Sequence, residues 1–288
     1  MVYNDRGYLW NKQEEYDKAL VDLNEAIRLD PELDVAYHNR GDAWYALGEY
    51  AKAIDDYNNA ILFGPENALI LQSCGKSWHH LENYEQAIEF YTQALQLDPD
   101  DAFTYNMRGR ALNGLEDYQR AIEDLERAVH LDPALASAYS HLGFAWNSLG
   151  DYDRAIEIYP EAIRHNPDDA DAYYSRGSTW HDLGEYEKSI ADFDESIRLD
   201  PTSAVSYYSR AYSWYDFGES ERALEDYDKS LELDPTDPWA YNNRGQIHYE
   251  LGNHQQALSD LNESIRLDNS DGNALHNRGD VWHALGEY

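Results

Sequence analysis

Apolar and polar positions alternate with helical spacing along the chain, and the pattern repeats every 34 residues. With position 1 of the repeat set at Asp34, apolar residues recur at positions 4, 11, 17, 21, 24 and 28, and small residues recur at positions 8, 20 and 27. A Leu-Gly-Glu-Tyr type phrase near position 15 and a proline at position 32 interrupt this spacing. The pattern predicts two helices per repeat whose apolar faces are covered only by neighbouring repeats.

The repeat accounts for all 288 residues, so we expect one continuous array and no second domain. Eight repeats are expected, followed by half of a ninth. Their predicted boundaries are 1–33, 34–67, 68–101, 102–135, 136–169, 170–203, 204–237, 238–271 and the half repeat 272–288.

Gly or Ala at position 8, Tyr at position 17, small residues at 20 and 27 and Pro at 32 resemble the tetratricopeptide-repeat (TPR) family. One departure is consistent, because the tryptophans occupy position 11 where the family often has one at position 4. The resemblance implies an all-α fold, an alpha-alpha superhelix in which antiparallel helix pairs form a right-handed solenoid. It also implies that the first helix of each pair lines the concave face, and it names no ligand.

Arg at position 7 and Asp at position 23 occur together in six repeats. Two repeats lack the Arg and have apolar residues at both positions, Cys74 with Phe90 and Leu142 with Ile158. This joint replacement predicts an ion pair between the two helices of one repeat. The predicted structural pairs are Arg6–Asp22, Arg40–Asp56, Arg108–Asp124, Arg176–Asp192, Arg210–Asp226 and Arg244–Asp260.

The composition narrows the classes of partner. Fifty-six acidic against 22 basic residues give a net charge of −34, which argues against nucleic acid and anionic membranes. Cys74 is the only cysteine, so an intrachain disulfide is excluded. The chain lacks an apolar segment of membrane-spanning length, so we expect no membrane insertion and a soluble protein. A cytoplasmic location is the default expectation, and an extracellular one stays open.

Candidate chemistry is sparse. The many glycines and carboxylates are explained by the repeat, so we expect no enzyme, no cofactor and no metal site. His79 and His80 are adjacent, and neighbours on a helix point in different directions, which argues against chelation by both. Pro160 falls inside the second helix of its repeat, where we expect a kink.

The concave face implied by the resemblance uses positions 2, 5, 9 and 12 of the first helices. Amide, imidazole and phenol side chains predominate there, and these groups suit a peptide backbone. Position 2 includes Phe103 and Trp239. The predicted ligand-binding residues are His38, Tyr45, His79, Asn106, Arg110, Asn113, Asn147, Tyr174, His181, Tyr208, Tyr212, Tyr215, Asn242 and Tyr249.

These observations favour a non-enzymatic protein–protein interaction scaffold that holds a peptide or partner segment in its groove. A structural alternative rests on the half repeat, where Arg278, Trp282 and Leu285 have no second helix to cover them. That arrangement indicates either a segment of a longer array or a homo-oligomer in which copies stack into a filament or tube. Carbohydrate binding in the groove is the third interpretation.

Overall fold

The computed structural model describes residues 1–286, which fall into two compact units, Met1–Gly150 and Asp151–Tyr288, each described by itself. Residues 287 and 288, the last two of the predicted half repeat, lie outside the described residues. Helices make up both units, and residues 1–286 contain no strand. The predicted all-α fold class, a solenoid of helix pairs, is therefore confirmed.

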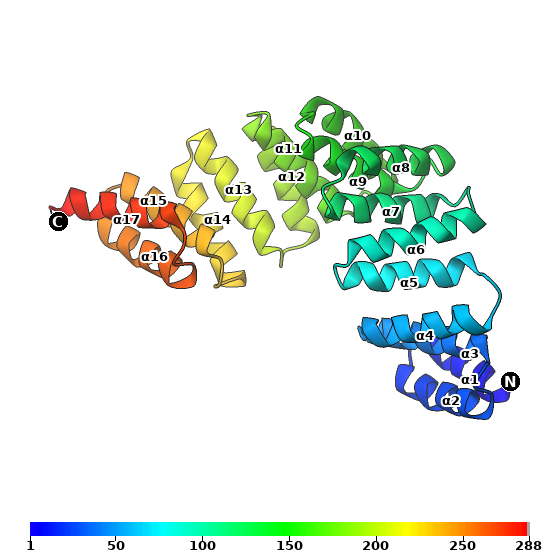
Figure 1. Ribbon diagram of the computed structural model, residues 1–288. Coiled ribbons are helices and arrows are strands. Elements are labelled where there is room, and N and C mark those ends of the chain that lie inside the picture. The colour runs from blue at the N-terminus through cyan, green and yellow to red at the C-terminus, as the bar shows by residue number, and fades with distance from the viewer. Residues whose placement is uncertain (287–288) are drawn as a thin grey trace. The chain divides into compact units, whose positions relative to one another are not determined.

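Unit 1 contains nine helices, four antiparallel pairs followed by the first helix α9 (Figure 1). Its first helices have odd labels and its second helices have even labels. Their bounds are α1 Val2–Lys12, α2 Tyr16–Leu29, α3 Asp34–Ala46, α4 Tyr50–Phe63, α5 Ala68–His80, α6 Tyr84–Leu97, α7 Ala102–Gly114, α8 Tyr118–Leu131 and α9 Ala136–Ser148.

Unit 2 begins with a second helix and continues with the same pairing. Helix α10 passes through Pro160 without interruption of its helical structure. The bounds are α10 Tyr152–His165, α11 Ala170–Asp182, α12 Tyr186–Leu199, α13 Ala204–Phe217, α14 Ser220–Leu233, α15 Pro238–Glu250, α16 His254–Leu267 and α17 Gly272–Leu285.

The turn within each pair needs a left-handed residue at position 15. Glycine occupies this position in six repeats, for example Gly48 with φ +77°. Because glycine has no Cβ, it adopts this left-handed conformation at little steric cost. Glutamate adopts the same conformation at Glu14, Glu82 and Glu116. The turn is thus fixed by the fold even where the residue is unfavourable for it.

The second turn, between repeats, ends at a capping residue. In six repeats position 34 carries a side chain that accepts hydrogen bonds from the first backbone amides of the next helix, as Asp237 does from Trp239 at 2.9 Å and Ala240 at 3.3 Å. Leu33 and Leu135 occupy this position in the other two, without a side-chain cap. Asn67, Asp101, Asp169, Ser203 and Asp271 cap their helices in the same way.

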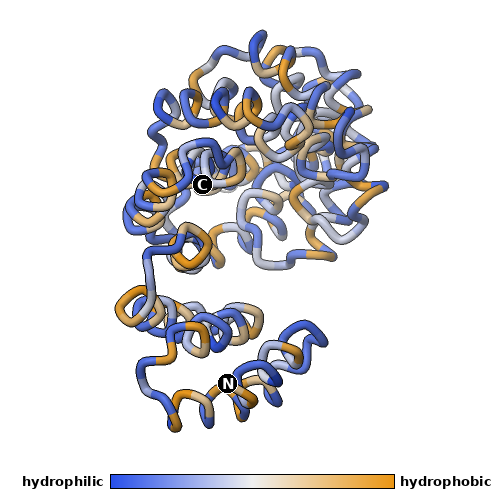
Figure 2. Tube along the Cα trace, turned by 90° about the vertical axis from the view of Figure 1, so that its right-hand side faces the viewer, coloured by the Kyte–Doolittle hydropathy of each residue, from blue (hydrophilic) through white to orange (hydrophobic). Residues whose placement is uncertain are grey.

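The core of each repeat lies where the two helices of a pair come closest. The small residues at positions 8 and 20 are buried there, as Gly41 and Ala53 are against the ring of Tyr57. Figure 2 shows hydrophobic and hydrophilic residues alternating along the helices. This alternation buries one stripe of each helix and leaves the remaining faces to solvent or to a partner.

Candidate functional site

The candidate site is the face that the first helices share, and the contacts between successive helices define it. Position 9 of one helix lies beside position 2 of the next, since Lys76 Nζ is 4.5 Å from the centre of the Phe103 ring. Position 12 lies beside position 9 of the next helix, since the His181 and Tyr212 rings stack at 4.8 Å. Positions 2, 9 and 12 therefore form one continuous surface within each unit, which we call the first-helix face.

Position 5 of one repeat forms hydrogen bonds with position 6 of the next. Asn39 Nδ2 donates to Asn4 Oδ1 at 2.9 Å, and Asn243 Nδ2 donates to the Tyr208 hydroxyl at 3.0 Å. The same pairing joins Ser209 to Tyr174, His141 to Asn106 and Asn277 to Asn242. These bonds hold adjacent first helices in register.

A second set of hydrogen bonds joins position 12 of one repeat to position 13 of the next. The Tyr215 hydroxyl donates to Glu250 Oε1 at 2.7 Å, and His181 Nε2 lies 3.0 Å from Asp216 Oδ2. The Tyr45 hydroxyl lies 2.9 Å from His80 Nε2. Several side chains predicted to bind a ligand therefore also hold adjacent first helices together.

Three of the predicted ligand-binding residues are buried, namely Asn106, Asn113 and Asn242. Asn106 is fully buried and its amide donates to Ser137 Oγ, while Asn113 donates to the backbone oxygen of His141 at 3.0 Å. Their amide groups serve neighbouring helices, so these three residues are not part of the accessible first-helix face.

The other predicted residues are accessible to different degrees. Arg110 and Tyr212 are exposed, and the remainder are half-buried. His38 Nε2 lies 3.7 Å from Asp42 Oδ1, and the Tyr249 ring lies 5.7 Å from that of His254. The half-buried residues are His38, Tyr45, His79, Asn147, Tyr174, His181, Tyr208, Tyr215 and Tyr249.

Large apolar side chains stand exposed on the first-helix face. We call them the exposed row, and the list of predicted ligand-binding residues contains only Tyr212 of this row. Val205 is 53% exposed and Trp239 is 61% exposed, although the next residue in each helix, Ser206 or Ala240, is buried. The row consists of Tyr8, Val35, Leu69, Phe103 and Phe144 in unit 1 and Val205, Tyr212 and Trp239 in unit 2.

Unit 1 carries the two basic residues of the first-helix face, Lys76 and Arg110. Lys76, Asp42 and Tyr45 line a small cleft of about 200 Å³ between α3 and α5. Burial lowers the pKa of the Lys76 ammonium. Unit 1 therefore offers two basic side chains on the first-helix face, with Asp42 beside Lys76 in the cleft.

Two histidines beside Arg110 are held neutral. Burial lowers the pKa of His79 to about 4 and that of His141 to about 3, and the positive charge of Arg110 adds to both effects. His79 Nδ1 is buried without a hydrogen-bond partner among residues 1–286. The described residues contain no group of three or more His, Cys, Asp or Glu side chains placed to hold a metal ion.

Unit 2 contains a cleft of about 430 Å³ at the amino-terminal ends of α13 and α15. Its apolar wall consists of Val205, Tyr208 and Trp239. Two carboxylates, Asp234 and Asp237, also line it. The cleft combines aromatic surface with negative charge.

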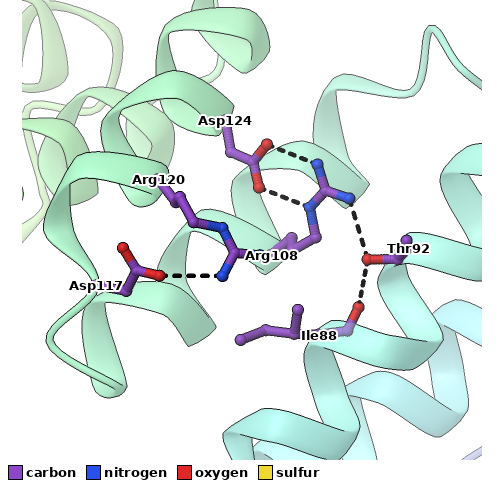
Figure 3. A network of polar contacts seen from close by, with 6 residues as sticks. All are labelled: Ile88, Thr92, Arg108, Asp117, Arg120 and Asp124. Atoms are coloured by element: carbon purple, nitrogen blue, oxygen red, sulfur yellow. Dashed lines mark hydrogen bonds and ion pairs between the residues drawn. The ribbon is translucent and has the colours of Figure 1, made fainter.

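The six Arg–Asp pairs are present on the opposite side of the helix pairs. Arg108 donates from Nε and Nη2 to the two oxygens of Asp124, at 2.6 and 2.7 Å (Figure 3). The hydrogen bonds with Asp124 raise the pKa of Arg108. The same bidentate geometry occurs in Arg6–Asp22, Arg40–Asp56, Arg176–Asp192, Arg210–Asp226 and Arg244–Asp260.

Five of the arginines that follow another repeat have a further partner that the sequence analysis missed. Arg108 Nη1 donates to Thr92 Oγ1 on the preceding second helix, at 3.1 Å (Figure 3). Position 25 supplies this acceptor, and an Asn, Thr or Asp there is the signal in the sequence. The other pairs are Arg40–Asn24, Arg210–Asp194, Arg244–Asp228 and Arg278–Asn262.

Arg176 is the exception, because position 25 of the preceding repeat is Pro160. Its guanidinium keeps the two hydrogen bonds to Asp192, at 2.7 and 2.6 Å. Proline offers no side-chain acceptor, so this arginine binds one helix instead of two.

None of the helices in residues 1–286 combines the length and apolar character that crossing a membrane requires. The comparison with curated proteins gave no match. Several solved structures share the fold, and three illustrate the range.

The Cut9–Hcn1 hetero-tetramer of APC/C superposes with a TM-score of 0.72 over 92% of this chain at 16% identity, and the chain spans about half, 52%, of that protein. YrrB, described as a TPR protein with an unusual peptide-binding site, gives 0.55 at 22% identity, covering 67% of this chain and 99% of YrrB. MamA gives 0.50 at 28% identity, covering 56% of this chain and 94% of MamA.

Three family models of this repeat match the sequence and together cover most of it. Two are described as tetratricopeptide repeat and match residues 106–159 and 148–204, and residues 35–67, 68–101 and 238–271. The third, described as TPR repeat, matches residues 7–48 and 212–252. The chain therefore belongs to the tetratricopeptide-repeat family.

Proposed function

We propose that this protein is a non-enzymatic scaffold that binds an extended segment of a partner protein along its first-helix face. TPR repeats form protein–protein interaction scaffolds, and three TPR family models match this chain. The observation that carries the proposal is the exposed row, whose members face solvent beside side chains that are fixed in place by inter-repeat hydrogen bonds. Large exposed apolar side chains on a rigid polar surface are characteristic of binding sites.

The electrostatics and rigidity support an extended peptide as the occupant. The hydrogen bonds between positions 5 and 6 and between positions 12 and 13 pre-organise the first helices, which reduces the entropy lost on binding. Half-buried tyrosines and asparagines beside the row offer donors and acceptors to a peptide backbone. Unit 1 presents Lys76 and Arg110, whereas the cleft of unit 2 presents carboxylates, so the two units favour different side chains.

Selection from a random peptide library displayed on phage tests the proposal. The wild-type protein is compared with the variant Val205→Ser/Tyr212→Ser/Trp239→Ser, which removes the exposed row of unit 2. The residues Tyr174, Tyr208 and His181 are left unchanged because they hold neighbouring helices together. We expect related peptides to be enriched on the wild type and lost on the variant.

A matched control alters the second helices. Val21→Ser/Leu62→Ser removes two side chains that are more exposed than those of the row and lie on α2 and α4. It should retain the selected peptides. Equal enrichment on all three proteins, or none on the wild type, would contradict the proposal.

Two other outcomes correspond to the alternative functions. Sedimentation that shows concentration-dependent polymers, together with no peptide selection, would favour assembly into a filament or tube. Enrichment of glycans on an array, lost in the row variant, would favour carbohydrate binding. Either result without peptide binding would replace the scaffold proposal.

A further inference from the structure

We propose that the unit 2 cleft recognises a cationic side chain, lysine or arginine, in the segment bound by the first-helix face. This inference rests on the proposed function and specifies which partner chemistry unit 2 accepts. The relevant side chains are Val205, Tyr208 and Trp239, with Asp234 and Asp237 at the rim.

The first observation concerns the exposure of Trp239. Seven of the eight tryptophans occupy position 11 and are half-buried, whereas Trp239 at position 2 is exposed. Its backbone amide is used by the Asp237 cap, so the backbone here is fixed while the indole faces the cleft. An indole exposed in this way on a rigid helix end is a binding surface that the fold itself does not need.

The second observation is that other tryptophans of this chain already hold cations. Lys52 Nζ lies 4.5 Å from the Trp44 ring centre and Lys188 Nζ lies 4.4 Å from that of Trp180. Lys18 over Trp10 and Arg222 over Trp214 repeat the arrangement. No lysine or arginine lines the cleft of Trp239, so a cation from a partner would complete it.

The third observation concerns the carboxylates. Asp234 Oδ1 accepts hydrogen bonds from the backbone and hydroxyl of Thr236, at 2.9 and 2.6 Å, and these bonds lower the pKa of Asp234. Asp237 Oδ1 accepts from the Trp239 and Ala240 amides. The Oδ2 atoms of both residues have no hydrogen-bond partner among the described residues, so two negatively charged oxygens remain available beside the indole.

The geometry suits the two parts of a basic side chain. The methylene stem can lie along Val205 and the Tyr208 ring, and the charged group can contact the Trp239 face and the free Asp oxygens. Burial and then the charge of Asp237 raise the pKa of Tyr208, so its hydroxyl stays protonated and adds no charge. Two carboxylates disfavour an acidic side chain at the same place.

Amide NMR spectra of the ¹⁵N-labelled full chain provide the test, because the Trp239 indole N–H gives its own signal. The variant Trp239→Phe identifies that signal. The probe is the peptide acetyl-Gly-Ser-Leu-Lys-Leu-Ser-Gly-amide, compared with versions that have Gln or Glu in place of Lys. We expect the Lys peptide to shift the Trp239 signal and to bind about fivefold to tenfold more tightly than the Gln peptide.

A matched pair of variants separates charge from capping. Asp234→Asn/Asp237→Asn keeps the Oδ1 acceptors that hold the turn and removes both charges, and should reduce the affinity for the Lys peptide to that of the Gln peptide. Asp268→Asn/Asp271→Asn makes the same change one repeat later, where Asn273 replaces the tryptophan, and should leave the affinity unchanged.

Equal affinity for the three peptides, or no loss in Asp234→Asn/Asp237→Asn, would overturn the inference. In that case the first-helix face would still be supported if peptides selected on the wild type were lost on the row variant. Failure of that selection would instead overturn the proposed function itself. A Lys peptide that binds without shifting the Trp239 signal would likewise exclude this cleft.

Discussion

Arg108 donates two hydrogen bonds to Asp124, at 2.6 and 2.7 Å, and so joins the two helices of one repeat sixteen residues apart. The Asp124 side chain is only 11% exposed, so its charge depends on this partner for compensation. The same guanidinium reaches the preceding repeat through Thr92. One arginine thus connects three helices. Because the nearly buried Asp depends on the Arg for charge compensation, a repeat that lacks the Arg also lacks the Asp.

Arg108→Leu should therefore lower the free energy of unfolding by about 2–4 kcal/mol, because it leaves a buried carboxylate without a cation. Arg108→Leu/Asp124→Ile should recover most of that loss, since the chain tolerates apolar residues at both positions elsewhere. Urea unfolding of the single and double variants measures the coupling. The exposed pair Arg28–Glu25 is the control, and Glu25→Gln should leave the urea unfolding curve essentially unchanged. A double variant no more stable than the single one would contradict this account.

Gly41→Ala should destabilise the protein by about 1–3 kcal/mol. A Cβ at this position would lie 2.6 Å from Cε1 of Tyr57, whose ring is fully buried and cannot move aside. Gly279 occupies the same position of its repeat with nothing within 4 Å, so Gly279→Ala should be neutral or stabilise its helix by about 0.5–1 kcal/mol. Thermal melting of both variants decides the matter, and equal effects would show that close approach is not the reason for glycine.

The protein should lose stability as the pH falls from about 6.5 towards 4. Burial lowers the pKa of His141 to about 3 and that of His79 to about 4, below the ordinary value of about 6.5. The unfolded chain therefore binds protons in this range that the folded chain does not, which favours unfolding. Above pH 6.5 both states are neutral and the effect disappears.

His141→Asn isolates this effect. Asn106 Nδ2 donates to Ser137, so Asn106 Oδ1 is the acceptor facing His141, and an asparagine can donate to it as Asn39 does to Asn4. The variant should resemble the wild type at pH 8 and lose less stability between pH 6.5 and 4.5. Parallel pH profiles for the two proteins would assign the acid sensitivity to other groups.

Pro160→Asp should stabilise unit 2 in two ways. It restores a backbone donor within α10, and it offers Arg176 the acceptor that Asp194 and Asp228 offer to Arg210 and Arg244 at 2.5 and 2.6 Å. Pro160→Ala restores only the donor, and we expect it to gain about 1–3 kcal/mol. Urea unfolding at low salt and in 1 M NaCl should show that the gain of the Asp variant falls with salt while that of the Ala variant does not. A salt-independent gain in both would exclude the contact with Arg176.

The fold could be predicted closely from the sequence because every repeat contains the same pattern of residues that determines a helix pair. A small residue at the close approach of Gly41, a large apolar residue opposite it at the position of Tyr57, and a left-handed turn residue at the position of Gly48 recur every 34 residues, so an irregular repeat changes little. The ion pairs could also be predicted from the sequence, because the Arg and the Asp are replaced by apolar residues in the same two repeats. The sequence placed Pro160 inside a second helix, and α10 indeed continues through that residue; the expected kink stays a prediction.

The first-helix face was harder to predict. The sequence indicates which residues share a helix face, and the burial of Asn106 and Asn242 depends on how closely the next helix approaches. The hydrogen bonds between positions 5 and 6 of adjacent repeats arise from that lateral spacing. Exposed members such as Val205 occupy the first turn of a helix. From the sequence alone, an exposed apolar residue at this place cannot be distinguished from a buried core residue.

Site-specific photo-crosslinking measures the central claim most directly. A peptide selected on the wild type is irradiated with protein carrying benzoyl-phenylalanine either at Tyr212, on the first-helix face, or at Glu225, exposed on the second helix α14. Our account predicts crosslinks from position 212 and none from position 225. Crosslinks from position 225 alone would place the partner on the second helices and contradict the account.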